Sequence, residues 1–139
     1  MNRLNDIYNL VLSTIKLIRP SISVYIIVSR NFIKITNLEN EKSASAISEK
    51  EFSTSRLLVA DTIIAEKLAK ELLNQVCTLT QLKTRSLKVF CQPLDKELGN
   101  LSPVEKMIFT DFAYQVGGRN IKIIDSVKEL TLEEINNYA

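Results

Sequence analysis

The first half of the chain alternates between helical and extended patterns of apolar residues. Apolar side chains recur at helical spacing through the opening segment, and Pro20 would end that helix. Residues 22–28 (ISVYIIV) are β-branched and aromatic and predict a buried strand. A short turn at 29–31 leads into a second strand over 32–38, which we expect to pair with the first. A short third strand follows at 44–47.

The middle of the chain predicts a loop, a helix and a strand. The serine-rich stretch 48–55 is expected to be an exposed loop. Asp61 is a plausible N-cap for a helix over 62–77, and a polar loop would follow it. Leu87, Val89 and Cys91 then alternate with other residues in a strand that ends at Pro93. The predicted helix buries one stripe of residues: Ile64, Ala65, Leu68, Ala69, Leu72 and Val76.

The last third carries the clearest local signals. Ser102-Pro103-Val104-Glu105 combines a serine cap, a first-turn proline and a capping-box glutamate. The helix that it opens would end at Gly117-Gly118. A strand at 121–124 and a short helix opened by a second capping box at Thr131 complete the chain. The stripe expected to be buried on the longer helix is Val104, Ile108, Phe112 and Val116.

This order of elements predicts an α/β fold with a mixed sheet. An antiparallel hairpin forms one edge, and crossover helices connect the parallel strands that follow. We expect two units, an N-terminal amphipathic helix at 1–20 and a single α/β domain at 21–139.

Composition removes much of conventional enzyme chemistry. The 139 residues contain no histidine, which excludes histidine bases and histidine-containing metal sites. Cys77 and Cys91 match no zinc or redox spacing, and two unpaired thiols agree with a reducing compartment. The net charge of +2 gives no electrostatic reason to expect a nucleic-acid partner. The first 98 residues contain no glycine, so a glycine-rich phosphate loop cannot lie there.

Three ordered blocks resemble bacterial actins of the MreB family, which set rod shape. Residues 57–61 (LLVAD) with 65–68 (AEKL) resemble that family's IADF…EKM stretch. Residues 89–93 and 101–108 (LSPVEKMI) are similar to its VCVP…VERRAI stretch, and 113–124 (AYQVGGRNIKII) to its AQGAGAREVFLI. The resemblance covers roughly residues 57–125 and implies the first subdomain of an actin-like, ribonuclease-H-like fold.

The residues that would bind nucleotide are degenerate in this comparison. The family places a phosphate loop of Asp-x-Gly type after the first strand, whereas this chain has Ser29-Arg30-Asn31 there, with Ser29 or Arg30 as a weak candidate anion contact. Glu105 falls at the position of the family's water-orienting glutamate, but with the phosphate loop missing we expect it to be only the third residue of a capping box. Asp125-Ser126-Val127 replaces the family's hinge motif. We therefore predict no catalytic residues, no cofactor and no metal, and a chain that alone neither binds nor hydrolyses ATP.

A nuclease site on the same general fold is a poorer alternative. Such a site gathers acids around Mg²⁺ and needs a carboxylate on the first strand. Residues 22–28 contain none, so Asp61, Glu105 and Asp111 would lack their anchor.

The opening helix is the candidate contact surface. It is apolar around more than half of its circumference, and Ile7, Leu10, Val11 and Leu17 are the residues expected to meet a membrane or a partner. We expect a non-catalytic binding or assembly module that contacts a bacterial actin or further copies of itself, as a homo-oligomer. Its expected location is the cytoplasm, with the inner face of the membrane as a further possibility. The alternatives are half of a split actin-like ATPase completed by another chain, and an unrelated regulatory α/β domain.

Overall fold

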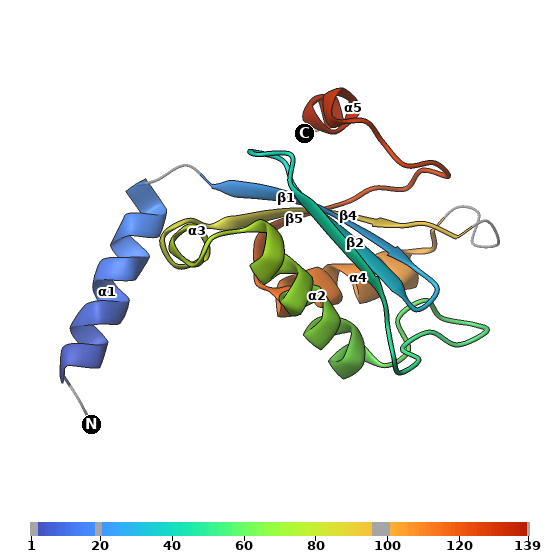
Figure 1. The fold of residues 1–139 in the computed structure, drawn as a ribbon, viewed down its shortest axis with the longest axis horizontal. Coiled ribbons are helices and arrows are strands. Elements are labelled where there is room, and N and C mark those ends of the chain that lie inside the picture. The colour runs from blue at the N-terminus through green and yellow to red at the C-terminus, as the bar shows by residue number, and fades with distance from the viewer. Residues whose placement is uncertain (1–2, 19–20, 96–100, 139) are drawn as a thin grey trace.

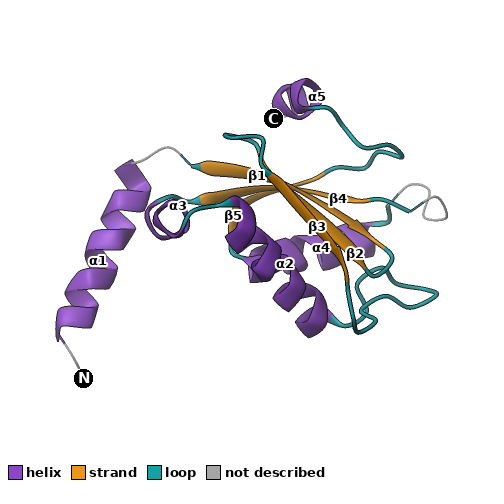
Figure 2. Cartoon of the chain, viewed as in Figure 1, coloured by secondary structure: helices purple, strands orange, loops and turns teal. Residues whose placement is uncertain are grey.

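A computed structural model describes residues 3–18, 21–95 and 101–138 (Figure 1). Five strands form one sheet: β1 (Ile22–Ser29), β2 (Phe32–Asn37), β3 (Ser43–Ile47), β4 (Leu87–Pro93) and β5 (Gly118–Ile123). The described helices are α1 (Arg3–Ile18), α2 (Thr62–Val76), α3 (Leu79–Thr84), α4 (Pro103–Val116) and α5 (Leu132–Tyr138), as Figure 2 shows.

The sheet is mixed, in the order β3-β2-β1-β4-β5. The hairpin edge is antiparallel, with Ile26 of β1 opposite Ile35 of β2. On its other side β1 runs parallel to β4, where Ile26 lies opposite Cys91, and β4 runs parallel to β5. The predicted hairpin edge, parallel strands and crossover helices are therefore confirmed.

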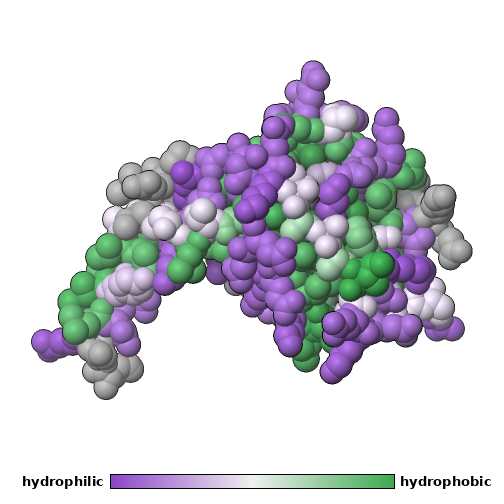
Figure 3. Space-filling model, viewed as in Figure 1, coloured by the Kyte–Doolittle hydropathy of each residue, from purple (hydrophilic) through white to green (hydrophobic). Residues whose placement is uncertain are grey.

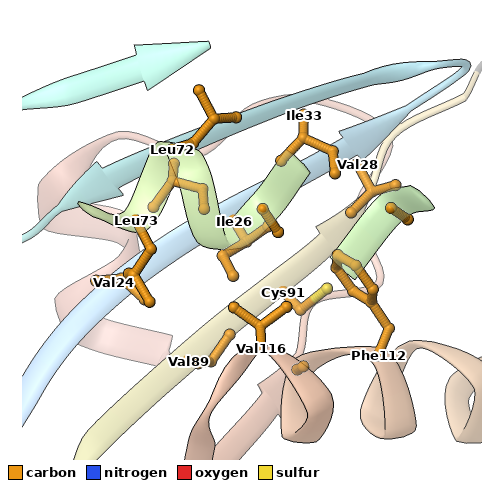
Figure 4. Packing of buried hydrophobic residues seen from close by; sticks show 14 of the residues in the cluster. Val24, Ile26, Val28, Ile33, Leu72, Leu73, Val89, Cys91, Phe112 and Val116 are labelled. Atoms are coloured by element: carbon orange, nitrogen blue, oxygen red, sulfur yellow. The ribbon is translucent and has the colours of Figure 1, made fainter. Parts of the chain in front are cut away.

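Each face of the sheet has its own apolar core. Val24, Ile26 and Val28 point toward α2 and α4, where they pack against residues such as Leu72 and Phe112 (Figure 4). The alternate β1 residues belong to a smaller cluster on the opposite face, which contains Tyr25, Ile27, Phe90, Ile124 and Ile135. Because β1 is covered on both faces, its sequence is an almost unbroken apolar run.

The helix caps form as the sequence predicts. The Asp61 side chain accepts a hydrogen bond from Ile64 N at the start of α2. Thr131 and Glu134 form the second capping box, which precedes α5. Gly117 ends α4 with φ +125°, a conformation that side chains disfavour. Gly118 is already the first residue of β5 rather than part of the helix stop.

Two segments differ from the sequence predictions. The polar stretch after α2 is not a loop: Thr78 and Gln81 form a capping box and open α3. The stretch 48–55 does lie between β3 and α2, but it is not wholly exposed, since Phe52 and Ser53 are buried. The Phe52 side chain is part of the main core, and its burial holds the loop against the domain.

The buried faces of α2 and α4 are rotated from the predicted stripes. Val104 is 66% exposed, and Phe109 and Ala113 are buried instead. Pro103 and Val104 occupy the first turn of α4. On α2, Ile64 and Leu68 are only partly buried, while the two alanines of the stripe are fully buried. Small side chains let the helix axis approach the sheet closely.

A polar network holds the chain that follows β5 against the smaller core. The Tyr25 hydroxyl donates to Gln92 Oε1 and accepts from Leu130 N at 3.1 Å. Gln92 Nε2 donates to the carbonyl oxygens of Ser126 at 3.0 Å and Lys128 at 2.7 Å. Burial raises the pKa of Tyr25. These bonds fix the path by which the chain returns to α5.

Candidate functional site

The turn between β1 and β2 lies where the actin resemblance places a phosphate loop. Asn31 adopts a left-handed φ of 51° in this turn. Its side-chain oxygen accepts hydrogen bonds from the backbone N–H groups of Phe52 and Ser53, both at 2.9 Å. Its own N–H donates to Ser53 Oγ at 2.9 Å. The turn is thus bonded to the loop that precedes α2.

Arg30 completes this closure. Its Nε pairs with Asp95 Oδ2 at 2.9 Å, and the Asp95 side chain is only 11% exposed. The other guanidinium nitrogens donate to the backbone carbonyls of Thr54 and Ser55. Protein groups therefore engage the Arg30 charge, and the anion contact suggested for Arg30 finds no support in this geometry. We call the turn, Arg30, Asn31 and Asp95 the closed end of the sheet.

Glu105 acts as a helix cap. Ser102 N donates to Glu105 Oε1 at 3.1 Å, and Glu105 N donates to Ser102 Oγ at 3.2 Å. Nearby, the carboxylate of Asp125 accepts from Leu101 N at 3.4 Å. Within residues 3–18, 21–95 and 101–138, no group of three or more carboxylates and thiols is arranged to hold a metal ion.

Helix α1 presents the predicted contact residues to solvent. Ile7, Leu10 and Val11 are 58%, 67% and 49% exposed, whereas the side chain of Leu17 lies outside the described part of the structure. The main contact of α1 with the domain is through α3. Figure 3 shows apolar atoms gathered along this helix, which projects from the rest of the molecule. None of the described helices is both long enough and apolar enough to cross a bilayer.

A depression of about 280 Å³ lies at the end of the sheet where β4 and β5 begin. We call it the basal pocket. Its apolar lining comes from α2, α3, β4 and α4, and three basic residues from three separate segments complete it. The lining residues are Lys70, Leu73, Asn74, Leu82, Arg85, Ser86, Leu87, Val116, Gly117 and Arg119. Sequence reasoning missed this pocket because residues 78–86 were interpreted as a loop, although the Thr78–Gln81 spacing could have identified the helix.

Both cysteines are free and buried. Burial raises the pKa of Cys77 to about 11 and that of Cys91 to about 12. A thiol nucleophile needs a lowered pKa and access to solvent, so neither residue is a candidate nucleophile.

Comparison with known proteins identifies the fold. The sequence matches no protein-family model and no curated protein. The structure is similar to the crystal structure of ethanolamine utilization protein EutJ from Carboxydothermus hydrogenoformans, with a TM-score of 0.50 and 16% identity. The similarity covers 77% of this chain and 38% of that one, so the chain spans well under half of its structural neighbour. This low-identity similarity shows the fold alone, and that fold is the actin-like one.

Proposed function

We propose that this chain is a non-catalytic assembly module with an actin-like fold, which acts through contacts with other proteins. The closed end carries this proposal. A phosphate loop needs free backbone N–H groups and room for the backbone to approach the phosphates. Here Asn31 donates its N–H to Ser53, and Arg30 is paired with Asp95.

The exposed apolar side chains of α1 support the choice of an assembly role. Large apolar residues that one small domain leaves uncovered are typical of protein or membrane contact sites. The partner is a bacterial actin, as the MreB-type resemblance suggests, or a second copy of the chain. A membrane surface is the second candidate, because basic residues flank the apolar part of α1.

An ATPase completed by a second polypeptide is the competing function. The chain spans 38% of EutJ, so a nucleotide cleft between two halves would need a part that the described residues do not supply. Calorimetric titration of the chain with Mg·ATP separates the two ideas. We expect no binding heat, whereas micromolar binding would overturn the non-catalytic proposal.

A charge placed on α1 tests the assembly role. Leu10→Glu should weaken self-association, or binding to an MreB-type actin, by roughly tenfold or more, because it buries an unpaired charge in the contact. Asn9→Glu is the matched control, since it adds the same charge to an exposed position on another side of α1. Sedimentation velocity and pull-down measure the effect. If the wild-type chain binds neither itself, nor an actin, nor vesicles, the proposed function is wrong.

A further inference from the structure

We propose that the basal pocket receives the N-terminal half of α1 from a second copy, in a reciprocal two-fold dimer. This inference rests on the proposed function, because it names the receptor for the contact surface of α1. The dimer would have two identical contacts, each between one copy's α1 and the other copy's pocket.

The pocket suits a helix that is apolar but carries an acid. Leu73 and Val116 are buried residues of its lining, and half-buried Leu82 adds a third apolar group. Lys70, Arg85 and Arg119 supply positive charge, and no acidic residue is present among the described residues that line it.

The three cations are held in place by neighbouring groups. Lys70 pairs with Glu66 at 2.8 Å, and Arg85 pairs with Glu39 at 2.7 Å. The Arg119 guanidinium lies over the Tyr114 ring, 5.2 Å from its centroid. Arg119 is exposed, and no carboxylate pairs with it among the described residues. It is therefore the cation best placed to meet an incoming acid.

The N-terminal half of α1 offers the matching groups. Leu10 follows Asp6 by four residues and Ile7 by three, so it lies beside both of them on one side of the helix. Asp6 is the only acid of α1, and Ile7 and Leu10 are exposed. A helix seated with this side down would place two apolar side chains against the lining and its carboxylate beside the basic residues.

The position of α1 favours exchange between two copies. The helix contacts α3, whose Leu82 lines the pocket, so α1 and the pocket lie at the same end of the molecule. The N-terminal half of α1 extends away from the domain (Figure 1) and keeps Ile7 and Leu10 in solvent. A two-fold arrangement covers both apolar surfaces at once. It also doubles the buried area, toward the roughly 1,200 Å² at the lower end of stable interfaces.

A charge exchange in the full-length chain tests this pairing. Asp6→Arg and Arg119→Glu should each weaken the dimer at least tenfold, and the double variant should restore it. Mixing the two single variants should also restore a dimer, because each contact then joins opposite charges. Lys67→Glu, at an exposed α2 position outside the pocket lining, is the matched control. Sedimentation equilibrium gives the dissociation constants, and circular dichroism confirms folding.

A second variant fills the pocket without using charge. Asn74 lines the pocket and is exposed, so Asn74→Trp should occupy the depression and abolish the dimer without removing a core side chain.

The outcomes separate this inference from the proposed function. If Leu10→Glu breaks self-association while Arg119→Glu and Asn74→Trp do not, the pocket is not the receptor, but assembly through α1 stands. A wild-type chain that stays monomeric overturns the dimer, and actin binding then decides the proposed function. Binding of α1 to vesicles of phosphatidylethanolamine and phosphatidylglycerol, with no dimer in solution, also overturns it.

Discussion

The two ends of the sheet differ in how their polar groups are paired. At the closed end, Asn31 and Arg30 bond to the loop before α2, and Asp95 neutralises the arginine. At the opposite end, buried and half-buried apolar side chains line the basal pocket together with Lys70, Arg85 and Arg119, and of these three cations Arg119 has no carboxylate partner among the described residues. The end where the MreB-type resemblance places a phosphate loop is thus closed by internal bonds, while the other end carries the pocket that we propose as the receptor for α1. If the proposal holds, one fold keeps its sheet and helices while the surface used for binding differs.

Of the substitutions that probe the two ends of the sheet, removal of the Asn31 side chain should cause the largest loss of stability. Asn31→Ala removes the acceptor for two backbone N–H groups and places alanine at a left-handed φ. We expect a loss of about 2–4 kcal/mol in unfolding free energy, measured by urea denaturation. Asn31→Gly tolerates that φ and should recover about 1 kcal/mol of the loss. A cost below 0.5 kcal/mol (roughly the level of an ordinary surface substitution) would mean that this end is not closed by Asn31.

Local signals in the sequence are sufficient to predict most of the helices and strands. The Ser102–Glu105 and Thr131–Glu134 boxes, the Asp61 cap and the strand patterns each depend on residues a few positions apart. Those interactions form within a short segment, so the sequence displays them directly. The short helix α3 has no buried residue, so apolar periodicity could not reveal it.

The closed end and the basal pocket are formed by residues that lie far apart in the sequence, so no single segment predicts them. Arg30 pairs with Asp95, which is 65 positions away, and the basic residues of the pocket come from α2, the C-cap of α3 and β5. Such residues come together only when the strands take their order in the sheet, which the sequence of one segment does not specify. Ile7, Leu10 and Val11 are exposed as a contact surface requires, but their role stays a prediction.

A methyl group at Gly118 should disturb the open end less than Asn31→Ala disturbs the closed end. A Cβ there would lie 2.9 Å from Ala113 O and from Val89 Cγ2. Because one of these two contacts is with a backbone atom, which cannot turn aside as a side chain can, Gly118→Ala should cost about 1–3 kcal/mol. At Gly117 a Cβ has room, with Leu87 Cδ2 3.8 Å away, but φ is +125°. Gly117→Ala should therefore cost about 1 kcal/mol from strain alone. Equal losses at both glycines, measured by thermal unfolding, would contradict this difference in packing.

The two thiols compare the open end with the main core, and their expected effect is the smallest. Cys77 follows α2 near the open end, and Cys91 lies in β4, fully buried in the main core. Both pKa values are raised in the folded chain, to about 11 and about 12, so the folded state keeps both protons while an unfolded thiol loses its proton near pH 8.5. The contribution of the two thiols to stability should therefore be constant below about pH 8 and fall as the pH rises through 9 and 10.

Single-cysteine variants separate the two contributions. Cys77→Ala leaves Cys91 as the reporter, and Cys91→Ala leaves Cys77. If the open end unfolds locally more often than the sheet, Cys77 should react with a thiol reagent several-fold faster than Cys91 at the same pH. Its rate should respond weakly to urea, because local opening exposes little surface, whereas the rate at Cys91 should follow global unfolding. Identical rates and urea dependences at both thiols would mean that the open end and the main core open together. The open end would then differ from the rest of the sheet in surface chemistry and not in local stability.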